Sequence, residues 1–372
     1  MRLAFYLLLT LSLTAGLYAQ QPQVAVLPQY GRILKHTPEF AFEIPDYSYG
    51  IGLEWNYQTT GRHAWQHQQG FPMLGATVLY YDLGSEVLGR AVGILPHFTY
   101  ALFPSGRWRG EVKCGSGVAY LTHPFDALTN PTNNAIGSHL NNITFIALGL
   151  HHRVARHHRL GIDGSFTHLS SGAASIPNYG LNIPAAQLTY RYDFKPIARS
   201  QYTRYSTFAK PPHRITADVY GALAFRRVLP AGGPRYAVYQ LRADVGYQFS
   251  PYSRLFGGVE YEYSEAAAAF AAHVNQFGSA AANSDVGHRP AAFVGYEWKL
   301  GRWIGMTNYL GYYLRQNPYL ANAQWYNRLA ARVFLPPIGQ PRTAFYLEVA
   351  LKSHLSTADY ISLGMGARIW GE

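Results

Sequence analysis

The sequence predicts an all-β protein that forms a transmembrane antiparallel β-barrel with a polar interior. Only 14% of the 372 residues are charged, against about 25% in a typical soluble domain. Tyrosine, phenylalanine and glycine are abundant, with 30, 19 and 36 copies, and successive segments alternate apolar and polar residues with a period of two. Beyond the N-terminus no run is apolar and long enough for a membrane helix. These observations indicate membrane-crossing strands.

The N-terminus is typical of an exported protein. Arg2 precedes an apolar run over residues 3–17, and the small residue Ala19 offers a cleavage point. This pattern indicates a signal peptide over residues 1–19, with an uncleaved anchor as the alternative. We expect residues 20–47 to be an N-terminal periplasmic segment and residues 48–372 to form the barrel. The expected location is therefore the cell outer membrane.

The clearest strand pattern runs over residues 235–249. Its apolar face holds Tyr239, Leu241 and Val245, and its polar face holds Gln240, Arg242 and Asp244. Comparable segments give about 14 strands, within about 12–16, an even number as in bacterial barrels. The expected strands are 72–82, 89–103, 108–122, 138–154, 159–169, 183–194, 213–227, 235–249, 253–263, 289–299, 302–314, 323–335, 343–353 and 360–370. A further candidate at 48–58 would raise the count.

Loop lengths predict the orientation of the barrel. The tight connections are 104–107, 156–158 and 250–252, and the long loops are 123–137, 170–182 and 264–288. Short turns face the periplasm and long loops face the exterior, so both termini are expected to lie in the periplasm. The segment 195–212 is too long for a periplasmic turn, and a division into two domains there is an open alternative. We favour one barrel because both halves carry the same alternation.

A candidate catalytic pair lies at the C-terminal end of the segment 159–169. His168 and Ser170 are two residues apart, so on a strand they share one face with Phe166, while the opposite face is polar. A serine hydroxyl becomes nucleophilic when a neighbouring base takes its proton and a third group orients that base. Asn182 has the parity to lie beside His168 on the next strand and accept its ring N–H. Asn178 is a plausible oxyanion donor through its side-chain NH₂.

At these residues the chain resembles the lipid A 3-O-deacylase family, the PagL-like acyloxyacyl hydrolases of outer membranes. The likeness rests on 166–172 and 177–182, extends upstream to 115–122, and covers about residues 30–195. It implies that His168 is the general base, Ser170 the nucleophile and Asn178 an oxyanion donor. The implied reaction is hydrolysis of the 3-position ester of lipid A in lipopolysaccharide, at the lipid-facing surface, without a metal or cofactor.

The chain departs from the family pattern at two positions. Asn182 stands where the family has a glutamate, and Ser171 where it has an asparagine. An amide orients His168 but does not stabilise the imidazolium by charge, so the resemblance implies a slower enzyme. An inactive descendant is the alternative, as a porin or an envelope-structure protein, since a barrel of about 14 strands leaves a wide lumen.

The remaining signals concern ligands. The formal net charge of +11 favours anionic partners. Because the basic residues are dispersed, lipid phosphates fit better than nucleic acid. His151, His152, His157 and His158 suggest a metal site, but the arginines among them disfavour a divalent cation. We therefore expect no metal. Cys114 is the single cysteine and cannot form an intrachain disulfide.

Overall fold

The computed structural model describes residues 22–207, 214–227, 233–274, 278–315, 324–336, 342–354 and 357–370. The signal peptide expected over residues 1–19 lies outside these ranges. Within them, no helix has the length and apolar character needed to cross a membrane. The described ranges contain three α-helices, all of them short: α2 (Ala64–Gln68), α3 (Glu265–His273) and α4 (Ala280–Asp285). The all-β barrel class predicted from the sequence is confirmed.

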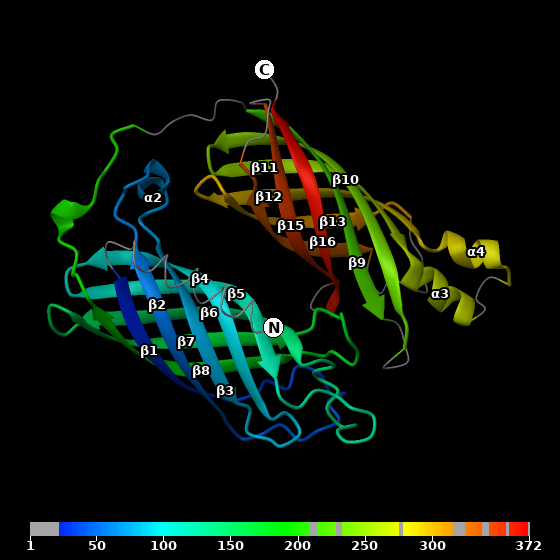
Figure 1. Ribbon diagram of the computed structural model, residues 1–372, viewed down its shortest axis with the longest axis horizontal. Coiled ribbons are helices and arrows are strands. Elements are labelled where there is room, and N and C mark those ends of the chain that lie inside the picture. Colours follow the sequence, from blue (N-terminus) through cyan, green and yellow to red (C-terminus); the bar gives the residue numbers. More distant parts are fainter. Residues whose placement is uncertain are drawn as a thin grey trace. The chain divides into compact units, whose positions relative to one another are not determined.

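The first closed barrel is made of eight antiparallel strands, coloured blue to green in Figure 1. Each strand pairs with its neighbours in the chain, and β1 pairs with β8 to close the barrel. The strands are β1 (Pro22–Gly31), β2 (Ser48–Gln58), β3 (Met73–Asp82), β4 (Arg90–Ser105), β5 (Trp108–Leu121), β6 (Leu140–Arg153), β7 (His158–Ser170) and β8 (Leu181–Asp193).

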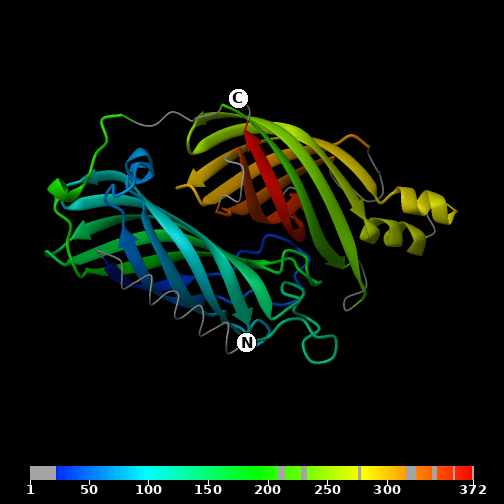
Figure 2. The same ribbon diagram turned by 45° about the horizontal axis from the view of Figure 1, so that its top comes forward.

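The second closed barrel also has eight antiparallel strands, coloured green to red, and the turned view in Figure 2 shows its curved wall. It closes where β16 pairs with β9. The strands are β9 (Ile215–Arg227), β10 (Arg235–Ser250), β11 (Ser253–Ser264), β12 (His288–Leu300), β13 (Ile304–Tyr313), β14 (Trp325–Phe334), β15 (Thr343–His354) and β16 (Thr357–Trp370).

Two expectations are corrected. The chain forms two eight-stranded barrels rather than one barrel of about 14 strands, and the segment 195–212, which fitted poorly as a turn, connects them. Alternation sets the face that a side chain takes, but it does not specify which strand pairs with which. The pore alternative depended on a lumen wide enough for solutes, and two eight-stranded barrels do not provide one. Eight strands enclose a space that side chains fill.

The strand that closes the first barrel was missed. Residues 22–31 were placed in a periplasmic segment, but they form β1 between β2 and β8. Pro22 and Pro28 argue against a strand in the sequence, because proline lacks the N–H that a paired strand donates. The pairing with β8 skips Leu27 and Pro28 and resumes at Gln29. The barrel therefore tolerates a proline where one ladder is interrupted.

Both lumens hold buried polar and charged side chains, as the alternation predicts, and the first barrel also buries an apolar cluster that includes Leu79 and Phe145. In the second barrel, five lumen arginines are each no more than 2% exposed: Arg242, Arg254, Arg328, Arg332 and Arg368. Arg368 donates to both carboxylate oxygens of Asp218 (2.8 and 2.8 Å) and of Glu297 (2.7 and 2.6 Å). Buried charges persist where they are paired and hydrogen-bonded. This network fills the lumen with side chains.

The ends of the strands place loops of different size at the two rims of the first barrel. One rim carries the connections 59–72, 106–107 and 154–157. The other carries 32–47, 83–89, 122–139 and 171–180. The second rim is where the sequence placed its candidate site, and we call it the loop rim.

Candidate active site

The strand β7 presents His168 on the outer surface of the first barrel. Along β7, Leu160, Ile162 and Phe166 are 50%, 68% and 39% exposed, and His168 follows with the same parity. The intervening side chains, such as Asp163 and Thr167, are buried toward the lumen. In a membrane barrel the outer surface faces lipid. His168 therefore lies at the loop-rim end of an apolar column.

His168 and Asn182 lie side by side, as their parity predicted. They are directly opposite each other in the pairing of β7 with β8, and His168 Nδ1 is 2.7 Å from Asn182 Oδ1. An amide oxygen only accepts, so Nδ1 donates its hydrogen. In the neutral ring Nε2 then carries a lone pair, which is the tautomer a general base requires.

Ser170 completes the end of β7 on the same side by parity and is 5% exposed. Gly180, the last residue before β8, lies against both residues of the pair. A Cβ added at Gly180 would be 3.1 Å from His168 Cε1 and 3.6 Å from Ser170 Cβ. The His168 ring edge and the Ser170 side chain therefore border the same small space, which only a glycine leaves open.

Asn178 is held by a neighbouring serine in the connection between β7 and β8. Its Oδ1 accepts from the Ser171 backbone N–H (2.8 Å) and from the Ser171 hydroxyl (3.0 Å). These two bonds fix the amide with its NH₂ directed away from Ser171. Ser171, which departs from the family pattern, thus has a structural task. The structure joins His168 to Asn182 and Asn178 to Ser171.

A polar row on the outer surface was missed by the sequence reading. Thr144 on β6 pairs with His168, Asn142 pairs with Ser170, and Ser116 on β5 pairs with Thr144. Asn142 donates to Ser116 Oγ (3.0 Å) and accepts from Thr144 Oγ1 (2.9 Å). Polar residues at lipid-facing parity were the available signal, because apolar ones are the rule there.

The connection 32–47 also packs onto the site and was not foreseen. The Leu34 N–H donates to Asn182 O (2.8 Å), and a His36 ring nitrogen lies 3.0 Å from Tyr179 O. The Tyr179 hydroxyl donates to the Glu39 carboxylate, and this bond raises the pKa of Tyr179 above its ordinary value. These contacts hold the segment before Asn182 in place.

The four histidines considered for a metal each contact an aromatic or carboxylate side chain, and His158 Nδ1 lies 2.8 Å from the Tyr190 hydroxyl. His151 Nε2 is 2.9 Å from Asp163 Oδ1 in the lumen, His152 lies against Trp108, and His157 stacks on Tyr192. In the ranges the structure describes, no group of histidine, cysteine or carboxylate side chains has the spacing of a metal site.

Comparisons with known proteins match each barrel to a family model. Residues 49–192 match the model described as lipid A 3-O-deacylase (PagL). Residues 215–371 match the model described as acyloxyacyl hydrolase, C-terminal domain. The two matches together span most of the chain. None of the curated proteins compared with the chain matches it.

Solved structures give weaker likenesses. The outer membrane enzyme PagL is 19% identical, with 45% of this chain and 98% of that chain covered and a TM-score of 0.34. Omp33 of Acinetobacter baumannii is 7% identical, with 95% and 100% covered and a TM-score of 0.17. A variant of the Rh. blastica porin is 9% identical, with 94% and 99% covered and a TM-score of 0.18.

Proposed function

Because the chain belongs to the lipid A 3-O-deacylase and acyloxyacyl hydrolase family of outer-membrane barrels, we propose that it is a serine esterase. Its substrate is lipid A of lipopolysaccharide, and it removes the acyl chain esterified at the 3-position. The observation that carries the proposal is the hydrogen bond from His168 to Asn182 on the lipid-facing surface. The loop rim then faces the cell exterior, where lipopolysaccharide lies.

The proposed chemistry assigns one task to each residue. His168 Nε2 takes the hydroxyl proton of Ser170 while Ser170 Oγ attacks the ester carbonyl. The Asn178 NH₂ donates to the oxyanion. Collapse of this intermediate forms an acyl-enzyme, and His168 returns the proton to the departing sugar oxygen. Water, deprotonated by His168, then releases the hydroxy fatty acid and restores Ser170.

The polar row beside the pair suits this substrate. An ester that reaches His168 from the bilayer brings its carbonyl and the hydroxyl of its acyl chain. Ser116, Asn142 and Thr144 supply hydrogen-bonding groups at that level, while Phe166 and Ile162 continue as an apolar track for the chain. The exposed Arg32 and Lys35 of the 32–47 connection, which packs onto the site, suit the phosphates of lipid A.

The test is incubation of the purified full chain with lipopolysaccharide, with mass spectrometry of the products. We expect release of a 3-hydroxy fatty acid and a lipid A product that has lost one acyl chain. Lipopolysaccharide that stays intact under conditions where the protein is folded would contradict the proposal and favour the non-enzymatic barrel.

Replacing Asn182 by glutamate is expected to increase kcat about tenfold. Amide-for-acid exchanges cost up to about 10⁴-fold when the amide imposes the wrong tautomer. Here Asn182 Oδ1 already faces Nδ1, so only the charge is missing, and a charge-assisted bond adds roughly 1–2 kcal/mol. The acidic limb of the pH–rate profile should move to higher pH, since a carboxylate stabilises the imidazolium.

Asn182→Gln is the matched control, because glutamine has the length of glutamate without its charge. Its kcat should not exceed that of the parent, and its acidic limb should stay in place. Equal gains in both variants would assign the effect to side-chain length and contradict the charge argument.

Gly180→Ala is expected to lower kcat by about 10- to 100-fold, while the protein remains folded. The φ of Gly180 is 75°, which costs an alanine roughly 1–2 kcal/mol. Its Cβ would also press on His168 Cε1 at 3.1 Å. Gly106→Ala is the control, since Gly106 has a φ of 60° and open space around its Cβ position. The same loss of kcat in both variants would refute a local effect on His168.

A further inference from the structure

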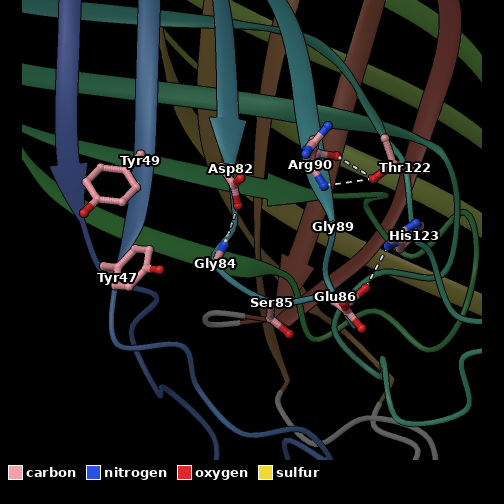
Figure 3. Close-up of a pocket in the computed structure, with 10 residues that line it drawn as sticks. All are labelled: Tyr47, Tyr49, Asp82, Gly84, Ser85, Glu86, Gly89, Arg90, Thr122 and His123. Atoms are coloured by element: carbon pink, nitrogen blue, oxygen red, sulfur yellow. Dashed lines mark hydrogen bonds between the residues drawn. The ribbon is translucent and has the colours of Figure 1, made fainter.

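A second candidate binding site lies on the other side of the first barrel. It is a cavity of about 540 Å³ at the loop rim, and Figure 3 shows its lining. Its side chains come from the end of the 32–47 connection, β2, β3, the 83–89 connection, β4 and the residues that follow β5. The candidate catalytic pair is on β7, four strands from β3 in the closed order of eight. We call this cavity the rim pocket.

The rim pocket opens on the lipid-facing surface. Tyr49, Asp82, Arg90 and Thr122 each continue the outward parity of their strand. Below them on the same columns are exposed apolar side chains: Ile51 at 47%, Val78 at 47%, Val92 at 48%, Ile94 at 45% and Val118 at 52%. The polar lining therefore begins where the apolar band ends, at the level of lipid head groups.

The pocket is built by fixed backbone and side-chain contacts. The Arg90 N–H donates to Thr122 Oγ1 (2.8 Å), and the Thr122 N–H donates to Arg90 O (2.9 Å). A His123 ring nitrogen, Nδ1, donates to the Glu86 carbonyl oxygen (2.7 Å), so Nε2 is the other nitrogen available to a ligand. Asn130 and Asn133 both donate to Val87 O (2.9 and 3.2 Å). The wall is thus preformed.

The lining combines three kinds of recognition group. Figure 3 shows the Tyr47 and Tyr49 rings on one side, Asp82 in the middle, and Arg90 and His123 on the other side. The two tyrosine rings are 4.9 Å apart and offer an aromatic surface. The Arg90 guanidinium matches a phosphate, and the Asp82 and Glu86 carboxylates accept hydroxyl or amide N–H groups. A phosphorylated sugar carries all the complementary groups.

We propose that the rim pocket binds the phosphorylated glucosamine head group of a second lipopolysaccharide molecule, which is not hydrolysed. Its acyl chains lie on the apolar columns below, over Ile51, Val78 and Ile94. The choice of lipopolysaccharide over a phospholipid rests on the proposed function, which places the loop rim in the outer leaflet. The cavity volume also suits a sugar head group, since ligand pockets typically measure about 300–1,000 Å³.

The test uses the full chain with Ser170→Ala, so that lipid is bound without turnover. Native mass spectrometry from detergent follows binding of deep-rough lipopolysaccharide, and dioleoyl phosphatidylethanolamine serves as competitor. We expect two lipopolysaccharide molecules per chain. Adding Arg90→Ala should weaken one of them at least about tenfold, and adding Glu86→Gln should weaken the same one by a few fold. Arg156→Ala, an exposed arginine at the other rim, should change neither.

An assay of hydrolysis distinguishes the role of the rim pocket from that of the catalytic site. In a chain that keeps Ser170, Arg90→Ala should leave kcat/KM within about twofold of the parent. A parallel loss of hydrolysis would overturn the inference, and so would binding that ignores Arg90→Ala. Displacement by phosphatidylethanolamine at equal concentration would overturn the choice of ligand. If the parent chain releases no fatty acid but Arg90-dependent binding persists, the proposed function fails and the rim pocket stands.

Discussion

Ser170→Ala is expected to abolish release of the 3-hydroxy fatty acid, with a fall of more than about 10³-fold in kcat. The alanine lacks the only atom of residue 170 that can form the acyl-enzyme, while the backbone of β7 and the bond from His168 to Asn182 stay unchanged. His168→Ala should give a loss of similar size, because the two residues act as a unit and their effects do not add.

The control for this variant is Ser165→Ala on the same strand. Ser165 is 6% exposed on the lumen side and donates to Ala185 O (3.3 Å), so its loss should leave the rate within about twofold. Labelling by a fluorophosphonate gives a second readout that needs no lipid substrate. We expect the label on Ser170 in the parent and none in Ser170→Ala. Full activity in Ser170→Ala would refute the assigned nucleophile.

Glu297→Gln is expected to destabilise the second barrel by about 3–5 kcal/mol. Glu297 is fully buried and accepts from Arg368 and from Arg332, the latter at 2.6 Å. Glutamine keeps the size of the side chain but leaves these two guanidinium groups with Asp218 and Glu348 as their remaining carboxylates. Both guanidinium groups are fully buried, and a buried charge that loses part of its pairing is costly.

Urea unfolding in detergent micelles measures this effect through the transition midpoint. Asp285→Asn is the control in the same barrel, since its ion pair with Arg315 is about half exposed on both sides. Exposed pairs contribute little because water and salt screen them, so that midpoint should not move. Equal stability of Glu297→Gln and the parent would mean that the lumen network is not held together by its charge pairing.

The candidate site was predictable from the sequence to the extent that it depends on neighbours in the chain. His168 and Ser170 are two residues apart on one strand, so their shared face follows from the period of two. Asn182 was foreseen because β8 follows β7 along the chain, and parity on two antiparallel neighbours places it beside His168. Ser116 and the 32–47 connection escaped, because their approach depends on the order of strands around the barrel. Asn142 lies on β6, next to β7 along the chain, so the same parity argument could have found it.

The amino-acid sequence by itself determined the strands and their two faces. Alternating residues dictate which side chains face lipid and which face the lumen, and 15 of the 16 strands in the structure correspond to expected or candidate segments. Only the tertiary structure decided that β1 pairs with β8 and β9 with β16, which makes two barrels of one chain. Ladder hydrogen bonds come from the backbone, which every residue shares, so the side-chain pattern does not encode where a sheet closes.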